Sequence, residues 1–278
     1  MNVDPLTLFV GTIMPYISLT VLIVGLLYEM AKWLRTPVPL KIPVTPAPKT
    51  YPGVLVRVTA EILLFRTFWR GSRKLWVGSY TYHLALWTII LDKMFLFIPP
   101  AIAGITAGAL VADFRPFLRA PLFGKFIAFT GIILSAALVY LLFRRLAIPA
   151  LKYASRASDY LILFLIMGVA LTGTYMRVFT QVNVDDVSTF IQSLGAFKPI
   201  APPADPFFLF HFFLVQSLMI YVPFSKVVHL IGAIFSPTKN QRNNPRDARF
   251  KNPWDYEVKI EPWEEYAKKF QIEETEGK

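Results

Sequence analysis

The 278-residue sequence is 55% hydrophobic and 15% aromatic, only 17% of its residues are charged, and its mean hydropathy is +0.48. These values exclude an ordinary soluble domain and favour a membrane protein. The absence of cysteine excludes disulfides, thiolate metal sites and iron–sulfur clusters in this chain. The net charge of +11 comes from lysines and arginines spread over the connections between apolar segments, which argues against nucleic-acid binding.

Five apolar segments approach or exceed the length that crosses a bilayer, which is about 20 residues. They predict an all-α, polytopic bundle of five membrane-spanning helices. The expected ranges are 6–31, 75–98, 122–143, 158–179 and 206–235. The first segment has no basic n-region and no small-residue cleavage site, so we expect a retained helix. Residues 1–235 would form the membrane domain.

Lysine and arginine gather in residues 32–74, 144–156 and after residue 236, whereas the other connections hold few. By the positive-inside rule these three regions are cytoplasmic and the N-terminus is outside. In residues 53–70, arginines punctuate apolar residues at helical spacing, which predicts an amphipathic helix at the interface. Residues 236–278 are polar with scattered aromatics, so we expect a cytoplasmic tail that docks a soluble partner.

The chain has only three histidines: His83, His211 and His229. Eighteen residues separate the last two, which is five helical turns, so both would face the same side about 27 Å apart. That spacing is close to the thickness of the hydrocarbon core. Ionisable residues inside a membrane are costly and usually mark a functional site. Pro223 lies between the two histidines and predicts a kink in the helix.

His83 and His229 are expected at the same depth on the cytoplasmic side. Two imidazoles on facing helices are typical of a b-type haem, held without a covalent link because the chain has no cysteine. Two histidines without a nearby carboxylate or thiolate are too few for a closed zinc site. Haem is therefore the better interpretation.

His211, near the outer surface, has no histidine left to pair with. At its depth the second helix carries Lys93 and Met94, and either side chain can ligate iron. A five-coordinate iron is another possibility. Lys93 can also simply reach the interface and pair with Asp92.

Three sequence segments resemble the respiratory nitrate reductase gamma-subunit family. They are FRTFWRGSRKLWVGSYTYH before and within the second helix, TGTYMR at the end of the fourth, and HFFLVQSLMIYVPFSKVVHLIGAIFSP as the fifth. The chain is more similar still to relatives of that family in sulfite-reductase-associated and heterodisulfide-reductase-like membrane complexes. The histidine spacing together with PFSKVVH is the most specific of these features.

The resemblance implies two haem b groups and a quinone, with menaquinone expected, in the cell membrane. His83 and His229 match the ligands of the inner haem, and His211 matches one ligand of the outer haem. The family's second outer histidine falls on Lys93, so a His/Lys pair is expected, with Met94 or an open position as alternatives. Electrons would pass between the quinone and a cytoplasmic iron–sulfur subunit, and further membrane or extracytoplasmic subunits are possible partners.

Two further groups of residues are expected to serve these cofactors. A quinone needs a polar contact at the outer end of an apolar cleft, and the candidates there are Lys93, Asp92 and Arg177. Haem propionates or lipid phosphates would meet basic side chains on the inner side. The candidates for that role are Arg66, Arg70, Arg73 and Lys226.

Two other functions are compatible with the sequence. The chain could be a haem-free membrane anchor that recruits a soluble enzyme through its polar tail. It could also be a transporter that uses Lys93 and Asp92 as an ion relay, although the sequence shows no inverted repeat. A reduced-minus-oxidised visible spectrum separates these functions from electron transfer.

Overall fold

The computed structural model describes residues 4–37, 43–44, 46–94, 121–180, 182–236, 239–243 and 261–272. Within these ranges the regular structure is helical, and no strand occurs. The chain divides into two compact units, each considered by itself. One comprises Met1–Thr36 with Thr59–Phe235, and the other comprises Pro37–Val58 with Ser236–Lys278. The first unit holds the three histidines.

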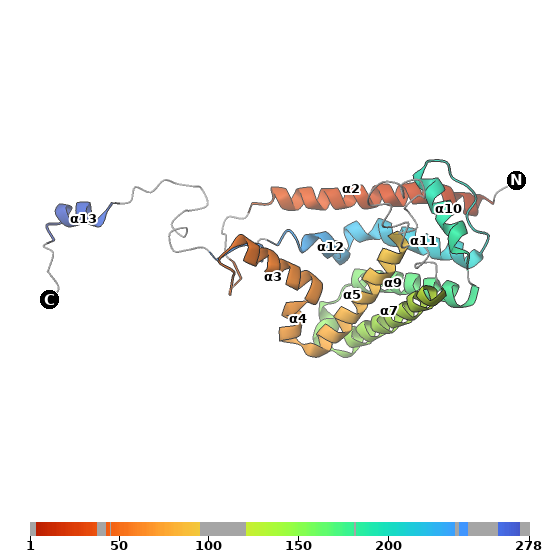
Figure 1. The fold of residues 1–278 in the computed structure, drawn as a ribbon, viewed down its shortest axis with the longest axis horizontal. Coiled ribbons are helices and arrows are strands. Elements are labelled where there is room, and N and C mark those ends of the chain that lie inside the picture. Colours follow the sequence, from red (N-terminus) through yellow and green to blue (C-terminus); the bar gives the residue numbers. More distant parts are fainter. Residues whose placement is uncertain are drawn as a thin grey trace. The chain divides into compact units, whose positions relative to one another are not determined.

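Five long helical stretches build the first unit (Figure 1). The first stretch joins α1 (Pro5–Leu8), a π-helical turn η1 (Phe9–Ile13) and α2 (Met14–Arg35). The others are α5 (Arg73–Met94), α7 (Pro121–Ala147), α9 (Ala157–Tyr175) with its π-helical extension η4 (Met176–Thr180), and α11 (Pro206–Tyr221). The contacts run in the order α2, α11, α9, α7, α5. Helices distant in sequence, α2 and α11, are therefore neighbours.

Four of these stretches are long and apolar enough to cross a membrane: Pro5–Arg35, Leu122–Ala147, Ala157–Thr180 and Pro206–Phe224. Their mean hydropathy lies between 1.8 and 2.4. Large apolar side chains such as Leu27, Phe143 and Phe164 are exposed on their outer surfaces, as expected for contact with lipid. The chain is a multi-pass membrane protein. Among the described residues α5 does not reach the same apolarity, because it carries tyrosines, serine, threonine and Asp92.

The amphipathic helix expected over 53–70 is two helices. α3 spans Tyr51–Leu64 and α4 spans Arg66–Gly71. Phe65 separates them because its backbone is left-handed, with φ 50°, a conformation that an α-helix cannot include. Two hydrogen bonds hold the break: Trp76 Nε1 donates to the Leu64 carbonyl at 2.8 Å, and Thr67 N donates to Glu61 Oε2 at 3.0 Å.

The fifth helix, expected to be continuous over 206–235, is also broken. α11 ends at Tyr221, and two 3₁₀ turns follow, η5 (Val222–Phe224) and η6 (Lys226–Val228), before α12 (His229–Gly232). Pro223 has no backbone N–H to continue the helix. Its ring packs on Gly25 of α2, where an added Cβ would lie 2.5 Å from Pro223 Cβ. The expected kink is therefore a full interruption, and His211 and His229 do not share one straight helix.

Short helices cover the two ends of the bundle. α10 (Val184–Gly195) precedes α11, and its fully buried Phe190 packs against Phe208 and Phe212. α8 (Pro149–Ala154) connects α7 to α9 at the other end. We refer to these as the α10 end and the α8 end. In the second unit, α13 (Trp263–Lys269) lies in the polar tail, whose role as a docking segment stays a prediction.

Candidate functional site

The imidazoles of His83 and His229 lie beside each other near the α8 end. His83 is on α5, and His229 is the first residue of α12. Their ring centroids are 6.1 Å apart and their planes meet at 79°. A metal ion between two imidazoles holds each ring nitrogen at about 2 Å, which places the two centroids about 6 Å apart. The two rings thus have the separation of a pair that shares one metal ion.

Backbone carbonyls fix the orientation of both rings. His83 Nδ1 lies 2.7 Å from the Ser79 carbonyl oxygen, and His229 Nδ1 lies 2.9 Å from the Lys226 carbonyl oxygen. A carbonyl oxygen can only accept, so each Nδ1 carries the proton and donates it. The lone pair of each neutral ring is then on Nε2, the arrangement that metal-binding histidines require.

An aromatic group surrounds His83. Phe65, Tyr82 and Trp87 contact its ring edge-on, with Phe65 and Tyr82 each at a centroid distance of 4.8 Å. Phe65 reaches this position because of its left-handed backbone. The break between α3 and α4 therefore places an aromatic ring against the histidine.

His211 occupies a different setting, nearer the α10 end. Its Nδ1 lies 2.8 Å from Thr172 Oγ1, and the Thr172 hydroxyl donates to the Gly168 carbonyl at 2.6 Å. With the hydroxyl proton donated to Gly168, His211 Nδ1 is assigned as the donor to Thr172 Oγ1, which leaves a lone pair on its Nε2. A Cβ added to Gly173 would lie 3.0 Å from His211 Cε1. The absence of a side chain at Gly173 therefore gives the ring its space.

Asp92, Lys93 and Arg177 form a charged cluster at the same end. Lys93 Nζ lies 2.9 Å from Asp92 Oδ2, and Arg177 Nη2 lies 4.0 Å from Asp92 Oδ1. The carboxylate thus links α5 to η4. Met94, the other expected ligand, is 56% exposed.

An apolar cavity of ≈ 470 Å³ lies beside His211's partner Thr172. Its walls come from α7, α9, η4 and the start of α11. The lining residues are Ile132, Ser135, Leu171, Thr172, Thr174, Tyr175, Phe179 and Phe207. Two of them, Tyr175 and Phe179, flank Arg177 in the sequence, so the cavity and the charged cluster share η4 and the end of α9.

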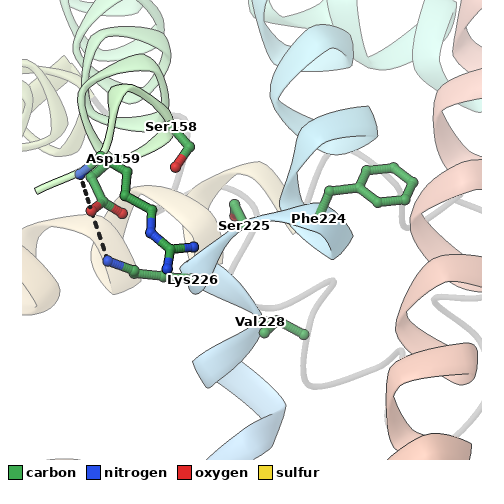
Figure 2. A pocket seen from close by; sticks show the side chains of 7 residues that line it. Ser158, Asp159, Phe224, Ser225, Lys226 and Val228 are labelled. Atoms are coloured by element: carbon green, nitrogen blue, oxygen red, sulfur yellow. Dashed lines mark hydrogen bonds and ion pairs between the residues drawn. The ribbon is translucent and has the colours of Figure 1, made fainter.

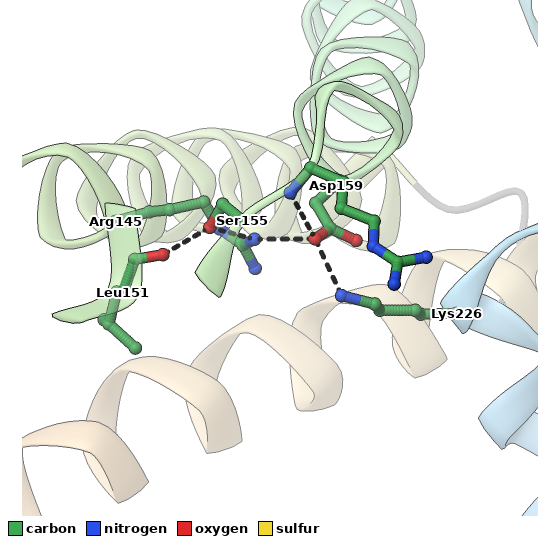
Figure 3. A network of polar contacts seen from close by, with 6 residues as sticks. Arg145, Leu151, Ser155, Asp159 and Lys226 are labelled. Carbon is green, nitrogen blue, oxygen red and sulfur yellow. Dashed lines mark hydrogen bonds and ion pairs between the residues drawn. The ribbon is translucent and has the colours of Figure 1, made fainter. Parts of the chain in front are cut away.

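The four basic residues expected at haem propionates are placed differently from one another. Arg66, Arg70 and Arg73 are exposed, and Arg73 stacks over the Trp69 ring at 5.3 Å. The side chain of Lys226 instead pairs with Asp159 at 2.7 Å, in a network with Arg145 and Ser155 (Figure 3). The sequence reasoning missed Asp159, although it is the one acidic residue between Asp113 and Asp185.

The imidazoles of His83 and His229 suit a haem better than a bare metal ion as ligands. Among the described residues, no three His, Asp or Glu side chains gather into a group that could hold a metal ion. A haem brings four nitrogen ligands of its own and needs only axial ligands from the protein. A pair of oriented imidazoles supplies these.

The chain is similar to known proteins. Residues 67–240 match the nitrate reductase gamma subunit family. The chain is also 28% identical to the Hdr-like menaquinol oxidoreductase cytochrome b-like subunit of Archaeoglobus fulgidus, over 88% of this chain and 83% of that protein. It is 30% identical to the protein of the same description from Archaeoglobus profundus, over 89% of this chain and 83% of that protein. The matched region covers more than half of the sequence, and the chain therefore belongs to the nitrate reductase gamma subunit family.

Proposed function

We propose that this protein is the membrane cytochrome b subunit of a menaquinol-oxidising complex. One structural observation carries the proposal. The ring centroids of His83 and His229 lie 6.1 Å apart, and each Nδ1–H donates to a backbone carbonyl. The description of both Archaeoglobus relatives as menaquinol oxidoreductase cytochrome b-like subunits supports it. The chain would carry electrons, and the terminal reaction would belong to another subunit.

Two haem b groups are proposed, one held by His83 and His229 and the other by His211 with Lys93. Each supplies a one-electron oxidation and reduction when bound. The protein contributes imidazole orientation at the first site through Ser79 and Lys226. At the second site Thr172 orients His211. Lys93 must leave Asp92 and lose its proton before its amine can bind a metal.

The cluster at the α10 end is the proposed contact for menaquinol. Arg177 and Lys93 can donate to a quinol oxygen, and the Asp92 carboxylate can accept a proton from its hydroxyl. The adjacent apolar cavity of ≈ 470 Å³ offers a surface for the hydrophobic tail. Binding, orientation and proton acceptance would thus come from one group of side chains.

The proposed topology adds α5 as a fifth span, because its 22 residues are long enough to cross the hydrocarbon core. The N-terminus would then face outward and the polar tail inward. Electrons would leave at the inner side to a cytoplasmic iron–sulfur subunit of the heterodisulfide-reductase-like type. The aromatics of the tail would help to dock that subunit.

The reduced-minus-oxidised visible spectrum of the purified chain tests the proposal, together with a haem assay. We expect a b-type α-band and two haems per chain. A chain without an α-band would be a haem-free anchor, which contradicts the proposal. One haem per chain would remove the second site and the role of Lys93 as a ligand.

Substitution of Gly173 by alanine is expected to disturb the second site alone. The added methyl would press on His211 Cε1 from 3.0 Å and turn the ring away from Thr172. Electron paramagnetic resonance (EPR) should show a shift in the signal of the His211 haem and no change in the other. Gly124→Ala is the matched control, because no atom lies within 4 Å of its added Cβ. Equal spectra for both variants would contradict the role of Gly173.

A further inference from the structure

Asp159 joins three parts of the bundle at the α8 end. It lies in the first turn of α9, and its side chain is 5% exposed. Oδ2 accepts from the Arg156 backbone N–H at 3.1 Å and from Lys226 Nζ at 2.7 Å. Arg145 Nη1, from the last turn of α7, lies 3.6 Å from the same oxygen and donates to Ser155 Oγ (Figure 3). The carboxylate therefore connects α7, α9 and the segment that leads to α12.

Lys226 is bound at both of its ends. Its ammonium group reaches Asp159, and its backbone carbonyl accepts the Nδ1 proton of His229 at 2.9 Å. The position of that carbonyl is not set by a continuous helix, because α11 ends at Tyr221 and Ser225 is extended, with φ −114° and ψ 170°. The 3₁₀ turn has its own hydrogen bonds, because Ser225 Oγ accepts from the Val227 backbone N–H at 3.2 Å and the Lys226 carbonyl also accepts the His229 backbone N–H. The placement of this turn against α9 needs contacts from outside it.

Packing alone does not supply those contacts on the α9 side. A cavity of ≈ 280 Å³ separates the start of α9 from this segment (Figure 2). It is lined by Arg156, Ser158, Asp159, Phe224, Ser225, Lys226 and Val228. The Lys226–Asp159 ion pair crosses beside this space. On the other side Pro223, two residues before Ser225, packs against Gly25 of α2.

We propose that Asp159 is the positioning residue for the His229 imidazole. The carboxylate holds the Lys226 ammonium, the Lys226 backbone then presents its carbonyl, and the carbonyl fixes the plane and tautomer of the ring. This role rests on the proposed function of His229 as a haem ligand. Lys226 thereby has a use other than contact with a haem propionate.

The test compares EPR spectra and midpoint potentials of the haem-loaded full chain in membranes. Asp159→Asn removes a negative charge, whereas Lys226→Gln removes a positive one. A purely electrostatic effect would shift the potential of the His83/His229 haem upward in the first variant and downward in the second. Loss of positioning would instead change the low-spin EPR signal of that haem in the same direction in both. We expect the same EPR change in both variants and an unaltered signal from the His211 haem.

Arg145→Gln is the matched control. Like Lys226→Gln, it removes one positive charge beside the Asp159 carboxylate, but it leaves the Lys226–Asp159 ion pair and the hydrogen bond from His229 to the Lys226 carbonyl intact. Lys226→Arg keeps the ion pair and should restore the wild-type spectrum. Wild-type spectra in both Asp159→Asn and Lys226→Gln would overturn the positioning role, as would equal changes in Arg145→Gln. Failure of the proposed function is distinct, because the wild-type chain would then contain no haem ligated by His229.

Discussion

Replacement of His229 by alanine is expected to remove one of the two proposed haems and to reduce the proposed menaquinol-dependent electron transfer by more than about a hundredfold. The described residues offer no third imidazole near His83, since His211 is bonded to Thr172 on α9. His83 alone would be left to hold the group. A pyridine haemochrome assay of the purified variant measures the loss directly.

Replacement of His229 by glycine instead of alanine allows a rescue experiment. His229→Gly leaves space for a free imidazole between the backbone and His83. Added imidazole should restore the low-spin spectrum, although it lacks the link to the Lys226 carbonyl. His211→Ala is the matched control and should remove the other haem. A His229→Ala chain that retained two low-spin haems would contradict the assignment.

Replacement of Lys93 by alanine is expected to change the haem proposed at His211 from six-coordinate low spin to five-coordinate high spin. Menaquinol oxidation should fall by about ten- to a hundredfold, because a ligand and a partner of Asp92 are lost together. The EPR spectrum of the oxidised protein measures the spin state. In this variant His211 alone would hold the group, so the spin state is measured on the chains that keep the haem.

Lys93→Arg separates the two roles of this side chain. Arginine keeps the charge beside Asp92, but its guanidinium stays protonated and cannot ligate iron. The high-spin signal should therefore appear in this variant as well. A wild-type spectrum in Lys93→Arg would assign Lys93 to the ion pair alone. Met94→Leu should leave the spectrum unchanged, and a high-spin signal there would transfer the ligand role to Met94.

Much of the bundle follows from the sequence because hydropathy directly reports the solvent that a segment meets. The four most apolar segments are found as helices long enough to cross a membrane. The second expected span is less apolar, because α5 carries polar residues such as Ser79 and Asp92 on the same helix as His83. Residues 95–98, the end of that expected span, lie outside the described residues.

The breaks were harder to predict than the helices. Pro223 signals an interruption because proline lacks a backbone N–H, yet the sequence does not show that α11 ends outright. Nothing in the residue type of Phe65 predicts a left-handed backbone, which costs free energy for a bulky side chain. That conformation depends on tertiary contacts such as Trp76 with the Leu64 carbonyl. The partner of Lys226 was missed because Asp159 lies 67 residues away in the sequence.

The anchoring of the three imidazoles has a consequence for how the protein can evolve. His83 donates to the backbone carbonyl of Ser79, an atom that every amino acid possesses, so substitution of Ser79 keeps the acceptor. His229 also donates to a backbone carbonyl, but in our proposal the position of that carbonyl depends on the ion pair between Lys226 and Asp159. His211 donates to the hydroxyl of Thr172, which a single codon change can remove. A substitution at Thr172 therefore removes the acceptor of His211, whereas a substitution at Ser79 leaves that of His83 in place. The family resemblance predicts a histidine at the position of Lys93, so the proposed ligand that departs from that pattern and the side-chain acceptor of His211 both lie at the α10 end.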